Sequence, residues 1–114
     1  MLKQDFEITK GETFTKDIII KVNNEIYPLD NYTALSEIRP YVGSKTLTET
    51  FLCEVYPEEG MVRISLTNEQ TKKLPFGVQY YDLLLINQET NEYTYYLGGK
   101  IVVKKHVTEI PTWV

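Results

Sequence analysis

The stretch Met61–Leu66 reads MVRISL and alternates apolar and polar residues more regularly than any other part of the chain. Val62, Ile64 and Leu66 fall on one face of an extended strand, and the polar residues between them fall on the other. Because successive side chains of a strand point to opposite faces, this period of two predicts a half-buried β-strand. The segment Pro57–Gly60 has the composition of a turn and marks where the strand begins.

The same alternation recurs on both sides of this strand, with turn residues between the segments. Asn23 and Asn24 predict a tight hairpin, since Asn tolerates the positive φ that such turns need. In the segment after Gly43-Ser44, the side chains expected to point inward are Leu47, Phe51, Cys53 and Val55. The further expected strands are Asp5–Thr9, Phe14–Val22, Glu25–Tyr27, Tyr32–Tyr41, Leu47–Tyr56, Val78–Asn87 and Glu92–Lys105.

One segment departs from this pattern. Thr67–Gln70 has the form of a capping box, in which a cap hydroxyl is followed three residues later by Gln. Pro75 ends the helical segment, because a residue before proline avoids the helical region. We therefore predict a short helical turn near residues 68–73. Such a short helix is not stable alone, so we expect Leu74 to anchor it to the sheets.

The 114 residues match the usual length of one domain, and 42% of them are hydrophobic, enough for one core. Many short strands, one helical turn and no β-α-β unit indicate an all-β protein. We predict a single antiparallel immunoglobulin-like β-sandwich of about 7–9 strands over residues 1–114, with an irregular tail at 108–114.

Charge and hydropathy limit the classes of partner that the chain could bind. The net charge is −4, and without a basic run we expect no nucleic-acid partner. The longest apolar stretches, Leu83–Ile86 and Ile18–Ile20, are too short to span a membrane, so we expect no membrane partner. Residues Met1–Lys10 lack the apolar run of a signal peptide, so we expect the chain to be made in the cytoplasm without one. Cys53 is the only cysteine and is expected to be a small buried hydrophobe.

The sequence shows no set of residues that could form a catalytic site. We expect no catalytic, metal-binding or cofactor-binding residues in this chain. His106 is the only histidine, so neither a hydrolytic triad nor a histidine-based metal site has enough members. Glu58 and Glu59 are neighbours in a turn and point apart. Asp82 lies within an apolar strand and needs a donor, for which Lys100, Arg39 or the backbone at Gly98-Gly99 are candidates. We interpret Asp82 as a structural polar anchor rather than a catalytic acid.

The last two strands are apolar on both faces. If Ile86 pairs with Thr94, then Tyr81 faces Gly99 on the core side, and Leu83 and Leu85 face Leu97 and Tyr95. Since outer faces of antiparallel sheets are normally polar, an apolar one indicates a contact site. We expect it to pack against another subunit; alternatively, Ile110 and Trp113 of the tail fold back over it. The candidate interaction surface consists of Val78, Tyr80, Leu84, Ile86, Tyr96, Val102 and Trp113.

Several motifs resemble those of phage tail and baseplate proteins. Lys10–Phe14 (KGETF) resembles a G-D/E-T-F strand opening, and Pro28–Ala34 (PLDNYTA) resembles a P-x-D-L-T-G-Y-T-A turn. The order and spacing are similar to those of the N-terminal domain of baseplate upper proteins and of immunoglobulin-like domains on phage particles. Other matching segments are Ile38-Arg39, Val62–Thr71, Leu74–Gly77, Tyr81–Leu83, Leu97–Ile101 and Val107-Thr108.

This resemblance implies a non-enzymatic structural component of a phage or prophage particle, such as a tail, baseplate, fibre-base or capsid-decoration subunit. Its expected location is the virion, and its expected partners are other virion proteins and further copies of itself as a homo-oligomer. The alternative is a carbohydrate- or cell-surface-binding β-sandwich, with tyrosines and Trp113 as a stacking platform for a glycan.

Overall fold

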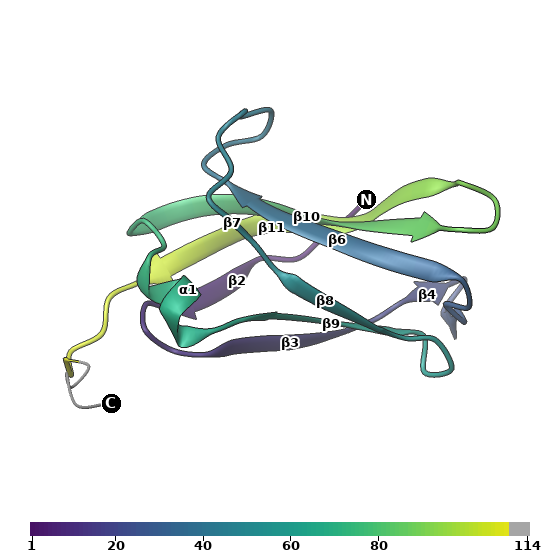
Figure 1. The fold of residues 1–114 in the computed structure, drawn as a ribbon, viewed down its shortest axis with the longest axis horizontal. Helices are drawn as coiled ribbons and strands as arrows, with labels where there is room; N and C mark the ends of the chain where they lie inside the picture. The colour runs from purple at the N-terminus through teal and green to yellow at the C-terminus, as the bar shows by residue number, and fades with distance from the viewer. Residues whose placement is uncertain (110–114) are drawn as a thin grey trace.

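The computed structural model describes residues 1–109, which form two β-sheets packed face to face (Figure 1). The first sheet has the strand order β1-β11-β10-β6-β7, and β2 also pairs with β11. Its strands are β1 (Leu2–Lys3), β2 (Phe6–Thr9), β6 (Tyr32–Arg39), β7 (Glu49–Thr50), β10 (Gly77–Asn87) and β11 (Tyr93–Lys104).

The second sheet has the order β3-β9-β8, with the Met61–Leu66 strand, β9, at its centre. A separate hairpin continues from β3, and one short helix connects the two sheets after β9 (Figure 1). These elements are β3 (Phe14–Ile19), β8 (Leu52–Tyr56), β9 (Met61–Leu66), β4 (Lys21–Val22), β5 (Glu25–Ile26) and α1 (Asn68–Lys72). The predicted all-β sandwich is confirmed.

The predicted sandwich differs from the structure in two respects. Eleven strands lie within residues 1–109, of which seven have four residues or more and four have only two. The sandwich is also not wholly antiparallel, because β1 and β2 both run parallel to β11. The edge of the first sheet beside β11 therefore consists of two short strands, β1 and β2, joined by Gln4-Asp5.

The core lies between the sheets and follows the predicted alternation. Leu83 in β10 and Ile64 in β9 have no exposed surface. Each points into the core between the two sheets. At one end the ring of Tyr81 stacks on Phe6 with centroids 5.0 Å apart and meets the edge of Phe51 at 6.1 Å. Aromatic pairs at such separations stabilise a core beyond their buried area.

Two expected strands are wrong in part. The segment Leu47–Tyr56 does not form one strand, because β7 pairs with β6 in the first sheet and β8 pairs with β9 in the second. Phe51 crosses between the sheets, donating its N–H to the Ser36 carbonyl at 2.9 Å. Leu47 is 46% exposed and does not point inward. Similarly, the segment 14–22 breaks at Ile20, so that Val22 is exposed.

The helix α1 confirms the predicted capping box and has a second role that the sequence did not indicate. Thr67 accepts from the Gln70 N–H, and Gln70 accepts from the Thr67 N–H. Leu74 is buried, as predicted. The fully buried Thr71 donates its hydroxyl to the Glu12 carbonyl at 2.8 Å and accepts from the Gly11 N–H at 3.1 Å. The helix therefore holds the turn between β2 and β3.

Gly98 and Gly99 permit a close approach of the N-terminal segment to β11. A Cβ on Gly99 would lie 2.5 Å from the Gln4 carbonyl oxygen, too close for any side chain. Asp5 accepts from the Lys100 N–H at 2.8 Å, and the Tyr81 hydroxyl donates to the Gln4 carbonyl at 2.7 Å. Glycine within a strand marks either a bulge or the close approach of another backbone. Here the paired glycines are required by the close approach of the N-terminal backbone.

Candidate interaction surface

The first sheet has one side against the core and one side facing away from it, which we call the outer face. Strand pairing defines its rows, since residues opposite each other on neighbouring strands point to the same side. Tyr80, for example, lies between Arg39 of β6 and Lys100 of β11. The outer face consists of Leu35, Glu37, Arg39, Val78, Tyr80, Asp82, Leu84, Ile86, Tyr93, Tyr95, Lys100 and Val102.

Five of the residues predicted for an interaction surface lie on this face, and they differ in exposure. Val78 is 47% exposed and pairs with Val102, which is half-buried. Tyr80 and Leu84 are also half-buried, whereas Ile86 is only 8% exposed beneath its neighbours. Ile86 therefore supports the face more than it offers contact area. Trp113 lies outside the described residues.

Tyr96 does not lie on the outer face, which corrects the prediction. The pairing of β10 with β11 follows the expected register from Gly77 to Leu83 and then shifts by one residue, so that Leu84 faces Tyr95. This β-bulge turns Tyr96 toward the junction of β3 and β4, where its hydroxyl accepts from the Lys21 N–H at 3.0 Å and donates to the Ile19 carbonyl at 3.4 Å. Tyr95, expected in the core, instead lies on the outer face and is 55% exposed.

Strand β6 supplies part of the face that the sequence analysis missed. Leu35, Glu37 and Arg39 lie beside Leu84, Asp82 and Tyr80 of β10, respectively. Leu35 is 53% exposed, which makes it one of the most exposed large apolar side chains of the sheet. The inward alternation of β6 was visible in the sequence and implied that these residues point outward. What the sequence did not show is that β6 pairs with β10.

A groove of about 370 Å³ runs across the outer face. Leu84 and Tyr80 form its base, and Leu35, Tyr95 and the turn after β6 border it. More of its surface is apolar than polar. Small-ligand pockets of this size are normally deep and enclosed, whereas this groove is open along its length. Its shape suits a side chain or a segment of another macromolecule.

The turn Tyr41–Ser44 stands out from the sheet beside the groove (Figure 1). Gly43 has a φ of 86°, and the Ser44 N–H donates to the Tyr41 carbonyl at 3.1 Å. Arg39 donates to the Ser44 carbonyl at 3.2 Å and so ties the turn to β6. Tyr41 and Val42 are 61% and 85% exposed at the tip of this fixed turn. The groove thus has an apolar wall.

Asp82 lies at the base of the groove without the donor expected for a polar anchor. Arg39 forms its ion pair with Glu37 at 2.9 Å. The Ser36 hydroxyl donates to the Asp82 backbone carbonyl at 2.6 Å, but among residues 1–109 the Asp82 carboxylate accepts no hydrogen bond and forms no ion pair. Gly98, directly opposite on β11, contributes no side chain. The expected donor to Asp82 is thus not found among the described residues, and its half-buried carboxylate has no partner there.

Burial raises the pKa of the Asp82 carboxyl above its ordinary value; the nearby Glu37 adds to this, and Arg39 opposes it. The folded chain thus binds this proton more tightly than the unfolded chain. The Asp82 charge consequently lowers stability at neutral pH, and this penalty disappears as the pH falls below the ordinary aspartate pKa of about 3.9.

We expect Asp82→Asn to raise Tm at pH 7, with the gain shrinking toward zero near pH 3. Thermal unfolding of the parent and of Asp82→Asn at several pH values between 3 and 7 measures this difference in Tm. Asp30→Asn, in an exposed turn, is the matched control for removing one negative charge. A gain of equal size for both variants, or no pH dependence, would contradict the explanation.

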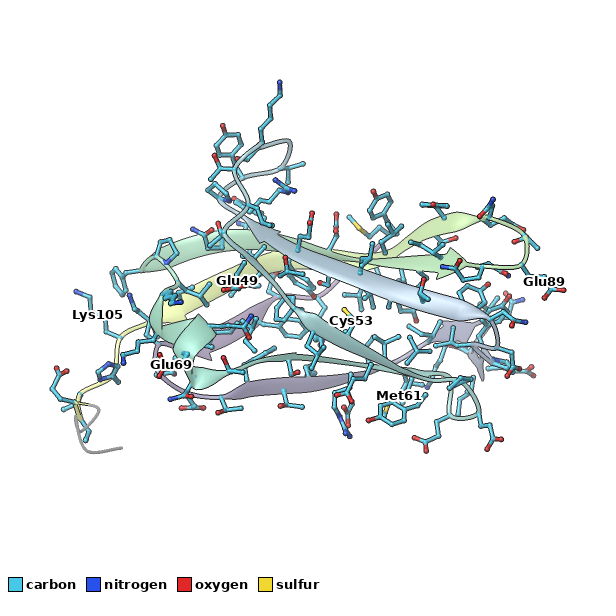
Figure 2. The ribbon with its side chains drawn as sticks, viewed as in Figure 1. Glu49, Cys53, Met61, Glu69, Glu89 and Lys105 are labelled. Atoms are coloured by element: carbon cyan, nitrogen blue, oxygen red, sulfur yellow. The ribbon has the colours of Figure 1, made fainter. Side chains whose placement is uncertain are left out.

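The other candidate reactive groups do not lie on the outer face. Cys53 lies between the two sheets (Figure 2), and burial raises the pKa of its thiol to about 11. His106 is exposed after the end of β11. Within residues 1–109, no three His, Cys, Asp or Glu side chains gather as metal ligands would. None of the helical structure described is long and apolar enough to cross a bilayer.

Comparison of the sequence with protein-family models and with curated proteins gives no match in either case. The fold, however, is similar to solved structures. One is the N-terminal domain of ORF48 of phage TP901-1, with a TM-score of 0.54 and 9% identity over 92% of this chain and 100% of that domain. Another is the NK cell receptor NKp44, with a TM-score of 0.50 and 12% identity over 90% of this chain and 97% of the receptor.

At these identities the similarity concerns the fold alone. It is an all-β sandwich that a phage protein and an immunoglobulin-like receptor share with this chain. Such a sandwich hosts many functions, so function must be argued from the surface. The resemblance noted in the sequence to phage immunoglobulin-like domains is supported at this level.

Proposed function

We propose that this protein is a non-enzymatic structural component of a phage or prophage particle, and that it attaches to another virion protein through the outer face. The observation that carries the proposal is the apolar, grooved outer face of β6, β10 and β11. The fold similarity to a domain of a phage protein supports the particle as its location. Self-association as a homo-oligomer remains a prediction for other surfaces of the chain.

The outer face has the composition of a contact site. Leu35, Tyr95 and Tyr93 are each more than half exposed; Leu35 lies on β6 and the two tyrosines on β11, on either side of Leu84 and Ile86 of β10. Interfaces are enriched in tyrosine, whose rigid ring gives large contact area at a small entropic cost. Contiguous apolar patches on a sheet are costly unless a partner covers them.

We expect Leu35→Glu to lower incorporation of the chain into particles at least tenfold. The Glu side chain removes apolar contact area and must lose its water when the partner covers it, which costs several kcal/mol. Incorporation is measured by quantitative mass spectrometry of particles assembled in a host that expresses only the variant.

Leu52→Glu is the matched control for this experiment. Leu52 is 61% exposed, similar to Leu35, but lies on β8 in the second sheet. Circular dichroism and Tm establish that both variants are folded. Equal incorporation of the two variants would refute attachment through the outer face.

A second candidate function is glycan binding, because three tyrosines surround the groove. Tyr41, Tyr80 and Tyr95 offer rings for stacking, and Arg39 and Asp82 offer hydrogen-bonding groups. On this alternative, the isolated protein binds a sugar on a glycan array, and Tyr95→Ala removes the signal. An array without signal, together with loss of incorporation for Leu35→Glu, eliminates it.

A further inference from the structure

We infer that the partner protein inserts a basic side chain, Arg or Lys, into the groove, where Asp82 is its counter-charge. This inference rests on the proposed function and specifies the chemistry of the same surface. It commits to one type of occupant: a protein segment with a cation at its contact centre.

The charges that face the groove point to a cation. Glu37 and Asp82 lie side by side on β6 and β10, and Arg39 is already engaged by Glu37 and by the Ser44 carbonyl. Lys100 lies on the outer face but forms no ion pair with Asp82. Among residues 1–109 the Asp82 carboxylate therefore has no ion-pair partner, and it lies in the lining of a mainly apolar groove. A half-buried carboxylate in this position gains most from a charged donor.

The shape of the groove fits the rest of an Arg or Lys side chain. Both residues combine a long apolar stem with a charged head. Leu84 and Tyr80 line the base along which a stem would lie, and Tyr95 offers a ring edge or face to a guanidinium. Gly98 contributes no side chain beside Asp82, and the Met1 sulfur lies over it, 3.1 Å from where a Cβ would stand.

A second copy of this chain fits the groove less well. A symmetric contact with its axis through the groove would bring the two Asp82 carboxylates together, and each would remain without a cation. The chain also carries a net charge of −4, which disfavours close self-contact at an acidic site. A more basic partner satisfies both conditions.

The test uses amide chemical shifts in NMR spectra of the intact protein, with N-acetyl-arginine amide as the probe. N-acetyl-citrulline amide, which has a similar shape but no charge, is the matched control ligand. We expect the arginine probe to shift the amides of Glu37, Asp82, Leu84 and Gly98 with a millimolar dissociation constant. Asp82→Asn should weaken this binding at least fivefold. Equal shifts with the citrulline probe, or unchanged binding by Asp82→Asn, would overturn the inference.

The particle assay separates this inference from the proposed function. If the proposed function and the basic partner side chain are both correct, Asp82→Asn lowers incorporation into particles at least fivefold and Leu35→Glu lowers it at least tenfold. If only Leu35→Glu lowers it, the outer face is the attachment surface but the basic side chain is ruled out. If neither lowers it, the proposed function itself fails. Because Asp82→Asn is expected to be more stable than the parent, misfolding does not confuse the result.

Discussion

Replacing Leu83 with Ala is expected to destabilise the protein by about 2–5 kcal/mol, the range for a fully buried leucine. Leu83 has no exposed surface and lies in β10, between β6 and β11 at the middle of the first sheet. The surrounding strands are hydrogen-bonded on both sides, so they cannot move in to fill the cavity. The cavity therefore adds its own cost to the lost transfer energy.

Chemical denaturation gives the free energy of unfolding of Leu83→Ala, and calorimetry gives a Tm expected to fall by roughly 10–20 °C. Leu52→Ala is the control, since Leu52 is 61% exposed and its truncation should change the free energy of unfolding by less than about 0.5 kcal/mol. A loss below 1 kcal/mol for Leu83→Ala would show that the two sheets pack less tightly than described.

Replacing Gly60 with Ala is expected to cost about 2–5 kcal/mol, from two separate effects. Gly60 has a φ of 58°, in the left-handed region, where a Cβ costs about 1–2 kcal/mol. The added Cβ would also lie 2.6 Å from the carbonyl oxygen of Tyr27, a backbone atom, and relieving such overpacking costs about 1–3 kcal/mol. Ile20 donates its N–H to the Gly60 carbonyl at 2.7 Å, so the turn cannot shift without breaking this bond.

Gly43→Ala isolates the first of these effects. Gly43 also has a positive φ, of 86°, but a Cβ there would meet no atom within 4 Å. The expected loss is therefore only the backbone strain, about 1–2 kcal/mol. Equilibrium unfolding in urea compares both variants with the parent. If they lose the same free energy, the close contact at Gly60 makes no difference to stability.

Much of the fold could be predicted because hydropathy reports which side of a strand is buried. The strand Met61–Leu66 has the bounds that its alternation predicted. The pairing of Tyr81 with Gly99 and of Leu83 with Leu97 also followed from the pattern and the length of the loop. The helical turn near 68–73 was marked by the local chemistry of its cap, and local chemistry is what a sequence displays most directly.

The failures have a common physical origin, since each depends on contacts between distant segments. The β-bulge exchanges Tyr95 and Tyr96 between the faces, and hydropathy cannot distinguish two identical residues. The crossing of Phe51 between the sheets is likewise set by a bond to Ser36 rather than by its own neighbours in sequence. One side of the groove comes from β6 and the turn after it, and the position of β6 beside β10 is a property of the whole topology.

The groove also explains why Asp82 escaped correct interpretation. A carboxylate within an apolar strand was expected to be satisfied inside the chain, as most buried polar groups are. Asp82 instead points to the outer face, where Gly98 and Glu37 flank it. A side chain that lowers stability and has no donor in the described chain is typical of a functional surface, where stability is given up for binding.

The parallel pairing of β2 with β11 has a mechanical consequence. Phe6 lies beside Ile101 and Thr9 beside Lys104, so the two strands run in the same direction side by side. A force that pulls residue 1 and residue 105 apart therefore acts along both strands in opposite directions. All hydrogen bonds of this ladder, including that from Lys10 to the Lys104 carbonyl at 2.9 Å, are then sheared together rather than opened one after another. Pulling along this direction is therefore resisted by the whole ladder at once.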